Sequence, residues 1–277
     1  MSAEVRPITP TLGAEIYGVD VHNDGHFEEV HKAFVDYSMI AIRDLDLSPE
    51  DHLSFAERWG EINVNRFFKA LDGYPRIATV TKEPDQTKAI GEGWHTDHSY
   101  DQVPAMCSLL LARETPEVGG DTAFASMNQA YLALSPAMRE MLHGIKACHS
   151  SRHAFGATKE VSNSEATKSG RLENAELATQ DAVHPVVITH PLSGKPGLYV
   201  NGDFTTHFEG WTKEESQPLL DFLYDHCTKA EFTCRLRWRT GTMAIWDNRA
   251  TQHKAINDYP GQRRHMHRIT IEGCPIS

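Results

Sequence analysis

The sequence predicts a mainly β protein with peripheral helices, folded as a jelly roll of the double-stranded β-helix type. Three observations lead to this fold class. Short apolar or alternating runs recur along the chain, separated by Gly, Pro and polar turn residues. Only a few segments combine helical spacing with an N-cap, and there is no internal repeat. The length of 277 residues is common for one large β domain, so we expect a single domain over residues 1–277.

The N-terminal part combines short strands with two helices. Residues 7–23 alternate apolar and polar positions between Pro and Gly, which predicts short strands. Helical spacing predicts a helix over 27–37, and the apolar run at 39–42 predicts a buried strand. Residues 48–60 predict a second helix, because Ser is a good N-cap, Pro suits the first helical position and Gly ends the segment.

The middle of the chain returns to β character. Strands are expected over 77–80 and 106–112, and a glycine pair at 119–120 turns into a further strand at 121–124. A helical block follows over 127–142, and its proline at position 136 predicts a break between two helices.

Residues 157–181 differ in composition from the rest of the chain. They are mostly Lys, Glu, Ser, Asn, Thr and Ala, with few large apolar side chains. Because the β pattern continues afterwards, this segment is no domain boundary. We expect a mobile loop, which is either a lid over an active site or a solvated insertion without a role.

The C-terminal part holds one helix among strands. Thr212 followed by Glu215 forms a capping-box pattern, and the apolar residues that follow have helical spacing. Strand-like runs fill the remainder, at 186–189, 198–200, 232–238, 242–246 and 265–271.

Composition and charge exclude several classes of function. The net charge of −11 argues against nucleic acid as a partner, because phosphate binding needs a basic patch. The five cysteines are scattered and form no CxxC pair, which indicates reduced thiols rather than disulfides or a zinc site. No signal sequence or transmembrane run is recognisable. We expect a cytoplasmic homo-oligomer that binds neither nucleic acid nor membrane.

A pair of potential metal ligands stands in the stretch Trp94-His95-Thr96-Asp97. On an extended strand, residues two positions apart point the same way, so the imidazole of His95 and the carboxylate of Asp97 would lie side by side. A second histidine, His253, follows a strand-like run and a turn. Together they would form a 2-His-1-carboxylate triad, which suits Fe(II) and leaves open positions for cosubstrate and O2. A zinc hydrolase and a non-catalytic metal-binding jelly roll remain alternatives.

The predicted strand at 265–271 begins within a basic run. Arg264 and Arg268 are four residues apart, so on a strand they face the same side. Two buried guanidinium groups near a metal are costly unless anions pair with them. The pattern therefore predicts two anionic ligands, and the alternative is a solvated strand face paired with surface acids.

Four motifs in this order resemble those of the TauD/TfdA family of Fe(II)/2-oxoglutarate-dependent dioxygenases. They are WHTD at 94–97, GGDT at 119–122, WDNRATQH at 246–253 and QRRHMHRITI at 262–271. The resemblance extends from about Ile8 to the C-terminus and implies the same jelly-roll fold. It also implies an enzyme that hydroxylates a small organic anion while 2-oxoglutarate is decarboxylated to succinate.

The resemblance assigns roles to individual residues. It implies that His95, Asp97 and His253 bind the iron. Arg264 matches the arginine that binds the distal carboxylate of 2-oxoglutarate, with the hydroxyl of Thr122 beside it. Arg268 matches the arginine that binds the anionic group of the substrate.

The substrate pocket departs from that of taurine dioxygenase, another member of the family. The positions of Asn65, Phe68 and Gly91 hold His, Tyr and Asn in that enzyme, so polar partners for a zwitterion are missing here. The chain resembles the (R)-dichlorprop branch of aryloxyalkanoate dioxygenases more than it resembles taurine dioxygenase. We expect an aryloxyalkanoate-like carboxylate or an apolar sulfonate or sulfate ester as substrate, with taurine as the alternative.

Three further residues complete the expected pocket. Phe155 and Phe204 match the aromatic wall of the family's pocket. His98, next to the metal-binding stretch, is expected either as an extra polar contact to the substrate or as a residue of the pocket rim.

Overall fold

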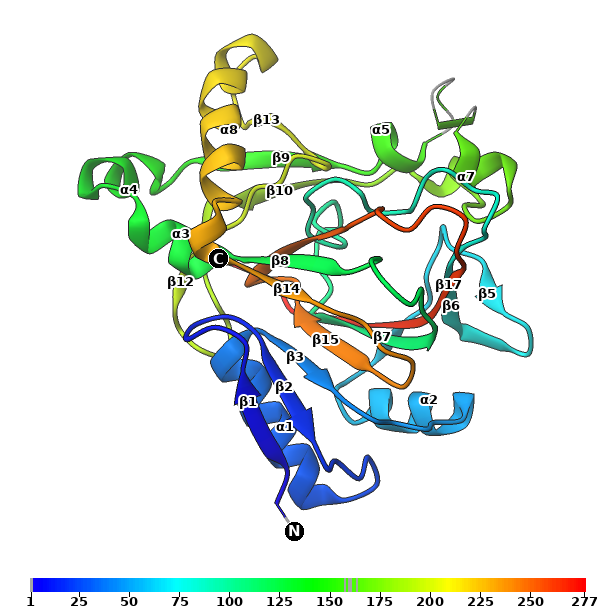
Figure 1. The fold of residues 1–277 in the computed structure, drawn as a ribbon. Helices are drawn as coiled ribbons and strands as arrows, with labels where there is room; N and C mark the ends of the chain where they lie inside the picture. Colours follow the sequence, from blue (N-terminus) through cyan, green and yellow to red (C-terminus); the bar gives the residue numbers. More distant parts are fainter. Residues whose placement is uncertain (1, 157, 159–160, 163) are drawn as a thin grey trace.

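The architecture of the protein was obtained as a computed structural model, which describes residues 2–156, 158, 161–162 and 164–277. Its largest element is a nine-stranded sheet (Figure 1). In order across the sheet the strands are β1 (Glu4–Pro7), β2 (Ala14–Tyr17), β3 (Met39–Ile42), β15 (Met243–Asp247), β7 (Cys107–Glu114), β17 (Arg264–Ile271), β6 (Tyr74–Lys82) and β5 (Ala70–Leu71), with β4 (Ile62–Asn63) paired to β17.

Three smaller sheets complete the β structure of the described residues. One contains β14 (Thr233–Leu236), β8 (Thr122–Ser126) and β16 (Thr251–Ala255). The others contain β10 (Asp181–Pro185), β9 (Lys146–Ser150) and β13 (Thr205–Phe208), and β11 (Val187–Thr189) with β12 (Pro196–Leu198). Side chains of β7, β15 and β17 pack against those of β8 and β14 in one buried apolar cluster. The wide sheet and the β14-β8-β16 sheet therefore enclose a common core, which is the predicted jelly roll.

Helices cover the outside of these sheets (Figure 1). The longer ones are α1 (Asp24–Tyr37), α2 (Pro49–Glu57), α3 (Met127–Ala133), α4 (Pro136–Leu142) and α8 (Lys213–Cys227). Short turns are α5 (Arg152–Phe155), α7 (Glu165–Lys168), η1 (Ala175–Leu177) and η2 (Ala230–Phe232). Residues of α1 and α2 pack with the wide sheet in one cluster, and residues of α3 and α8 pack with β9, β12 and β13 in another.

Local sequence signals explain most helix ends. Ser48 and Thr212 each form a capping box, with Asp51 and Glu215 respectively. The helical block at 127–142 breaks before Pro136, as predicted. Helix α1 begins three residues earlier than predicted, because the side chain of Asn23 accepts a hydrogen bond from the backbone of His26 and caps the helix there.

The prediction that the WHTD stretch is an extended strand was wrong. Only His95 makes a bridge, with His253, and Asp97 begins a turn. The two backbones exchange hydrogen bonds, from His95 N to His253 O (3.1 Å) and from His253 N to His95 O (2.9 Å). The pairing with β16, rather than the period of a strand, therefore sets the direction of these side chains.

The segment at 157–181 has more structure than the predicted loop. Its described part contains α7 and η1, and Phe68 and Leu172 form a bridge. The predicted loop also includes residues 157, 159–160 and 163, which lie outside the described residues. Its mobility and its function as a lid stay predictions.

Membrane insertion through a helix has no candidate in the part of the chain that the structure describes. None of its helices is long and apolar enough to span a bilayer.

Candidate active site

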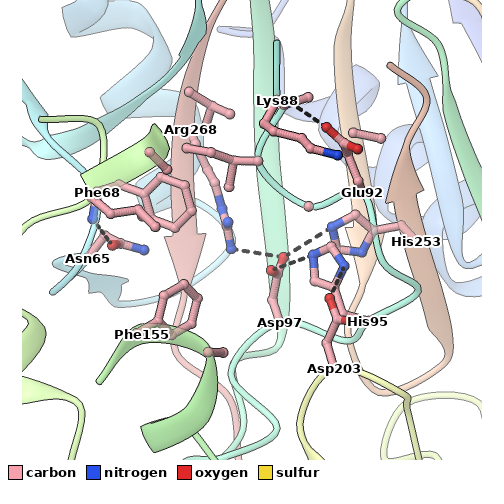
Figure 2. Close-up of a pocket in the computed structure, with 18 of the residues that line it drawn as sticks. Asn65, Phe68, Lys88, Glu92, His95, Asp97, Phe155, Asp203, His253 and Arg268 are labelled. Atoms are coloured by element: carbon pink, nitrogen blue, oxygen red, sulfur yellow. Dashed lines mark hydrogen bonds and ion pairs between the residues drawn. The ribbon is translucent and has the colours of Figure 1, made fainter. Parts of the chain in front are cut away.

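A cavity of about 710 Å³ lies between the wide sheet and the β14-β8-β16 sheet. Strands β6, β7, β15 and β17 contribute lining residues from one side, and β8 and β16 from the other. Further lining residues come from the segments 65–68, 88–100 and 203–204 and from the described residues of 154–172. Figure 2 shows the side chains of His95, Asp97 and His253 converging in this cavity, next to Arg268. The fold thus brings four of the predicted site residues together.

His95, Asp97 and His253 form a compact cluster of potential metal ligands. One ligand atom from each lies within 4.8 Å of the others. The Nε2 atoms of His95 and His253 are each 3.7 Å from an oxygen of Asp97. All three residues are less than a tenth exposed. Two imidazoles and a carboxylate on one side of a cavity fit a divalent metal with open coordination positions.

The orientation of His95 is fixed from behind. Its Nδ1 donates to the carbonyl oxygen of Gly93 at 2.9 Å, which leaves the Nε2 lone pair directed toward Asp97. Gly91, with φ of +78°, packs directly on this ring, because a Cβ there would lie 3.0 Å from His95 Cε1. The glycine at this position therefore packs against a candidate metal ligand, in addition to offering the cavity no polar side chain.

His253 is held by ring packing instead. Its ring lies 4.6 Å from that of Trp246 and 5.9 Å from that of Phe124, centroid to centroid. Burial and the neighbouring His95 hold the pKa of His253 well below its usual value. A neutral imidazole is the form that binds a metal ion.

Asp97 is held in its ionised form. Ser108 Oγ donates to Asp97 Oδ2 at 3.0 Å, and Arg268 Nη2 lies 2.8 Å from the same oxygen. Burial alone would raise the pKa of Asp97, but the positive charge of Arg268 and the imidazoles of His253 and His95 lower it by more than burial raises it. The pKa therefore lies well below its ordinary value.

Arg268 and Arg264 are both buried, which contradicts the alternative of a solvated strand face. Arg268 contacts Asp97, and its Nε is buried without a hydrogen-bond partner among the described residues. Arg264 forms no ion pair in the described part of the chain, and its guanidinium lies 5.4 Å from the ring centroid of Trp238. Trp238 Nε1 donates to Thr122 Oγ1 at 2.9 Å, so the Thr122 hydroxyl hydrogen is free to donate into the cavity.

The predicted substrate pocket is largely aromatic. Phe68, Phe155 and Phe204 all line the cavity, and the guanidinium of Arg268 lies 5.5 Å from the ring centroid of Phe68. The side-chain oxygen of Asn65 has no capacity left for a substrate. Its Oδ1 already accepts from the backbone N–H groups of residues 67 and 68, at 2.9 and 2.8 Å. Asn65 can therefore offer the cavity only N–H donors.

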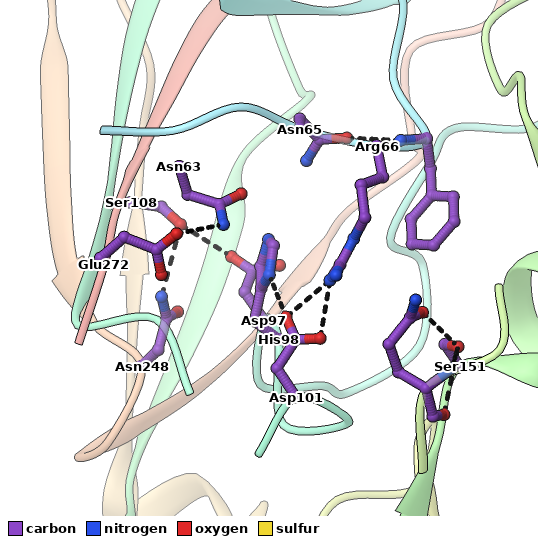
Figure 3. Close-up of polar contacts among 12 residues, drawn as sticks. Asn63, Asn65, Arg66, Asp97, His98, Asp101, Ser108, Ser151, Asn248 and Glu272 are labelled. Atoms are coloured by element: carbon purple, nitrogen blue, oxygen red, sulfur yellow. Dashed lines mark hydrogen bonds and ion pairs between the residues drawn. The ribbon is translucent and has the colours of Figure 1, made fainter. Parts of the chain in front are cut away.

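His98 is not a rim residue, because it is only 3% exposed. Its Nδ1 lies 2.9 Å from Asp101 Oδ2, and Arg66 Nη2 lies 2.7 Å from both oxygens of that carboxylate. Figure 3 shows the carboxylate of Asp101 contacted by both His98 and Arg66. The Nε2 atom of His98 is buried and has no hydrogen-bond partner in the described part of the chain. His98 lines the cavity, so it can contact a substrate there.

Several residues of this cavity were not predicted from the sequence. Tyr100, Lys88, Glu92 and Asp203 all line it. Asp203 lies behind His95, with Oδ2 3.8 Å from Nδ1 (Figure 2). Each lies in a loop or turn, and no local pattern separates such residues from surface ones. Their roles depend on chain segments that meet only in the fold.

Comparisons with known proteins agree with this geometry. The family model described as "Taurine catabolism dioxygenase TauD, TfdA family" matches residues 4–270. An alpha-ketoglutarate-dependent sulfate ester dioxygenase from Pseudomonas putida is 32% identical, over 99% of this chain and 90% of the relative. An alpha-ketoglutarate-dependent 2,4-dichlorophenoxyacetate dioxygenase from Cupriavidus pinatubonensis is 28% identical, over 98% of each chain. A crystal structure of a taurine dioxygenase from Burkholderia xenovorans superimposes with a TM-score of 0.81 at 29% identity, over 99% of this chain and 92% of that chain.

Proposed function

Since this chain belongs to the taurine catabolism dioxygenase TauD, TfdA family, we infer that it is an Fe(II)/2-oxoglutarate-dependent dioxygenase that oxidises a small organic anion. Fe(II), 2-oxoglutarate and O2 are its metal, cosubstrate and oxidant. Together they supply the oxidising power: one oxygen atom enters succinate as 2-oxoglutarate loses CO2, and the other enters a substrate C–H bond.

The ligand roles of individual residues are part of the proposal. His95, Asp97 and His253 hold the iron, supported by their convergence within 4.8 Å. Arg264 and Thr122 bind the distal carboxylate of 2-oxoglutarate, supported by a buried guanidinium without an ion pair in the described residues and a free hydroxyl hydrogen. The bidentate geometry of arginine suits a carboxylate better than a lysine ammonium does.

The substrate assignment depends mainly on one observation, the position of Arg268 next to Phe68. The guanidinium binds the anionic group of the substrate, and the N–H donors of Asn65 and the His98 ring lie in the same cavity. The apolar body lies against Phe68, Phe155 and Phe204. An aryloxyalkanoate or an apolar sulfonate or sulfate ester meets these requirements. Hydroxylation beside the ether, sulfonate or sulfate group makes the product collapse and release a phenol, sulfite or sulfate.

A zwitterionic sulfonate such as taurine is the second candidate. Asp203 supports it, because this carboxylate lines the cavity and accepts no hydrogen bond from another side chain of the described residues. It could pair with an ammonium group that Arg268 would repel.

The test is succinate formation and O2 consumption with a substrate panel. The panel contains an aryloxyalkanoate, an alkyl sulfate, an alkyl sulfonate and taurine, each with Fe(II), with Zn(II) and without metal. We expect turnover only with iron and O2. Product release with Zn(II) in the absence of O2 would indicate a hydrolase, and metal binding without any turnover would indicate a non-catalytic protein.

We further propose a single domain over residues 1–277, a cytoplasmic location and a homo-oligomeric state. The five free cysteines support a reducing compartment. Size-exclusion chromatography with light scattering tests the oligomeric state.

A further inference from the structure

Lys82 is a buried cation next to the proposed cosubstrate arginine. Its side chain is at the end of β6, and the residue is only 3% exposed. Its Nζ is buried and has no hydrogen-bond partner among the described residues, nor is any ion pair of Lys82 found there. The ammonium lies 4.4 Å from the ring centroid of Tyr259. A lysine this deeply buried is uncommon without an anionic partner.

The sheet register directs Lys82 to the same side as Arg264. The two residues are directly opposite each other in the antiparallel pair of β6 and β17, and opposite residues in such a pair share a face. Val80, two residues before Lys82 and therefore on the same face, lines the cavity. Lys82 itself is not one of the lining residues, and its ammonium lies against the Tyr259 ring. Tyr259 in turn packs on Gly120, two residues before Thr122.

The nearby acids form no ion pair with either of these two cations in the described part of the chain. Asp121 and Asp258 both pair with Arg235, at 2.6 and 3.2 Å. Glu92 accepts from the backbone of Ala89 at 2.6 Å and from the side-chain amide of Asn257 at 2.9 Å. The cosubstrate end of the cavity thus holds two buried positive charges without an ion pair in the described part of the chain.

We propose that Lys82 is a second cation of the cosubstrate site, which together with Arg264 selects a 2-oxo acid that carries a distal carboxylate. This inference is based on the proposed function of the cavity. Lys82 is a positioning residue: it acts through the field that it adds behind Arg264 and Tyr259, in an interior where charges are weakly screened. Burying an unpaired ammonium is costly, and a carboxylate bound at Arg264 reduces that cost. Arg264 supplies the directional hydrogen bonds.

The experiment compares two cosubstrates that differ only in the distal carboxylate. Binding of 2-oxoglutarate and of 2-oxopentanoate is measured by calorimetry on the Mn(II)-loaded protein without O2, for the wild type and for Lys82→Met. We expect Lys82→Met to weaken 2-oxoglutarate binding about tenfold, the effect of about 1.4 kcal/mol, and to change 2-oxopentanoate binding less than twofold. Lys82→Arg should restore most of the 2-oxoglutarate affinity. Lys69→Met is the matched control, because Lys69 is exposed just before β5.

Thermal unfolding separates this function from a structural one. Because methionine removes a buried charge, the ligand-free Lys82→Met protein should be as stable as the wild type or more stable, but 2-oxoglutarate should stabilise it less. Unchanged 2-oxoglutarate affinity, or an equal loss for both cosubstrates, would overturn the inference. If the wild type itself failed to prefer 2-oxoglutarate over 2-oxopentanoate, the proposed function would fail first, and the inference with it.

Discussion

Arg268 Nη2 lies 2.8 Å from Oδ2 of Asp97, so the arginine proposed to bind the substrate contacts the carboxylate proposed to bind the metal. Both groups are buried, at 7% and 6% exposure. An anion that binds Arg268 competes with Asp97 for the guanidinium. In the proposed site, substrate binding at Arg268 and metal binding at Asp97 are therefore coupled through one ion pair. Replacing Asp97 removes more than a potential metal ligand, because it also leaves the buried Arg268 without its partner.

His95→Ala, Asp97→Ala and His253→Ala should each abolish turnover. The two histidine variants should remain folded, because the residues line a cavity. Asp97→Ala should also lose stability, by roughly 3–5 kcal/mol, since it leaves Arg268 buried without its partner. Metal content, succinate formation and urea unfolding measure the three effects. Near-wild-type, iron-dependent activity in any one variant would show that the residue is not a ligand.

The two arginine variants should separate the cosubstrate from the substrate. Arg264→Ala should raise the KM for 2-oxoglutarate strongly, by roughly 2–5 kcal/mol of lost pairing for a buried carboxylate. Arg268→Ala should mainly raise the KM for the prime substrate and leave uncoupled 2-oxoglutarate decarboxylation largely intact. Steady-state kinetics with each component varied gives both values. The opposite pattern would mean that the two roles are exchanged.

Local signals made much of the fold and some of the site predictable. The caps at Ser48 and Thr212 depend on residues three positions apart, and the structure contains both capping boxes. Strand β16 was not predicted as a strand, because its sequence Thr-Gln-His-Lys-Ala has little apolar character and its pairing partner β8 is remote in sequence. The burial of His98 was also not predictable, since it depends on Asp101 and Arg66. The sequence identified which residue types could act together, but their contacts depend on strand pairing.

Stability should fall in mildly acidic solution because of buried histidines. Burial lowers the pKa of His52 and of His149 to about 3 each, from the usual 6.5. In the unfolded chain these two histidines are therefore protonated below about pH 6.5, whereas in the folded protein they stay neutral down to about pH 3. As the pH falls between these two values, each histidine lowers the free energy of unfolding by up to about 1.4 kcal/mol for every pH unit. Urea unfolding at pH 7.5, 6.0 and 5.0 should show this decline in the free energy of unfolding. In His52→Leu the part of the decline that the two histidines cause should be roughly halved. An unchanged decline would argue against a neutral, buried His52.

Glu165 should hold the segment at 164–172 over the cavity. Its carboxylate accepts hydrogen bonds from the backbone and hydroxyl of Thr87 and from the backbone of Lys88, and it pairs with Arg171 at 3.2 Å. Glu165→Ala should raise the KM of the prime substrate about threefold to tenfold, because the hydrogen bonds that hold the segment are lost. It should also speed proteolytic cleavage between residues 157 and 181.

Glu176→Ala is the matched control, because Glu176 is an exposed acid of the same segment. Equal proteolysis of both variants and the wild type would remove the support for a lid that Glu165 holds closed.

The last prediction concerns the class of substrate. The ammonium group of taurine needs a hydrogen-bond acceptor or an anion as its partner. Asn65 offers only donors, because its side-chain oxygen already accepts two hydrogen bonds, and Phe68 and Gly91 have no polar side-chain atom. Leaving one buried polar group of a substrate unpaired costs about 1–3 kcal/mol, which corresponds to roughly 5-fold to 150-fold in kcat/KM. An aryl or alkyl group with a single anionic charge avoids this cost. We therefore expect an aryloxyalkanoate or an apolar sulfonate or sulfate ester to give a higher kcat/KM than taurine.

Asp203 provides the internal check on that prediction, because it is the carboxylate that could serve taurine. Asp203→Asn keeps the shape of the side chain and removes its charge. If the substrate carries one anionic charge, the variant should change its KM little, whereas any residual taurine activity should fall. Side-by-side measurement of kcat/KM for both substrates in the wild type and in Asp203→Asn decides the matter. Taurine as the best wild-type substrate, with a loss in Asp203→Asn, would overturn the apolar assignment and leave the iron chemistry unchanged.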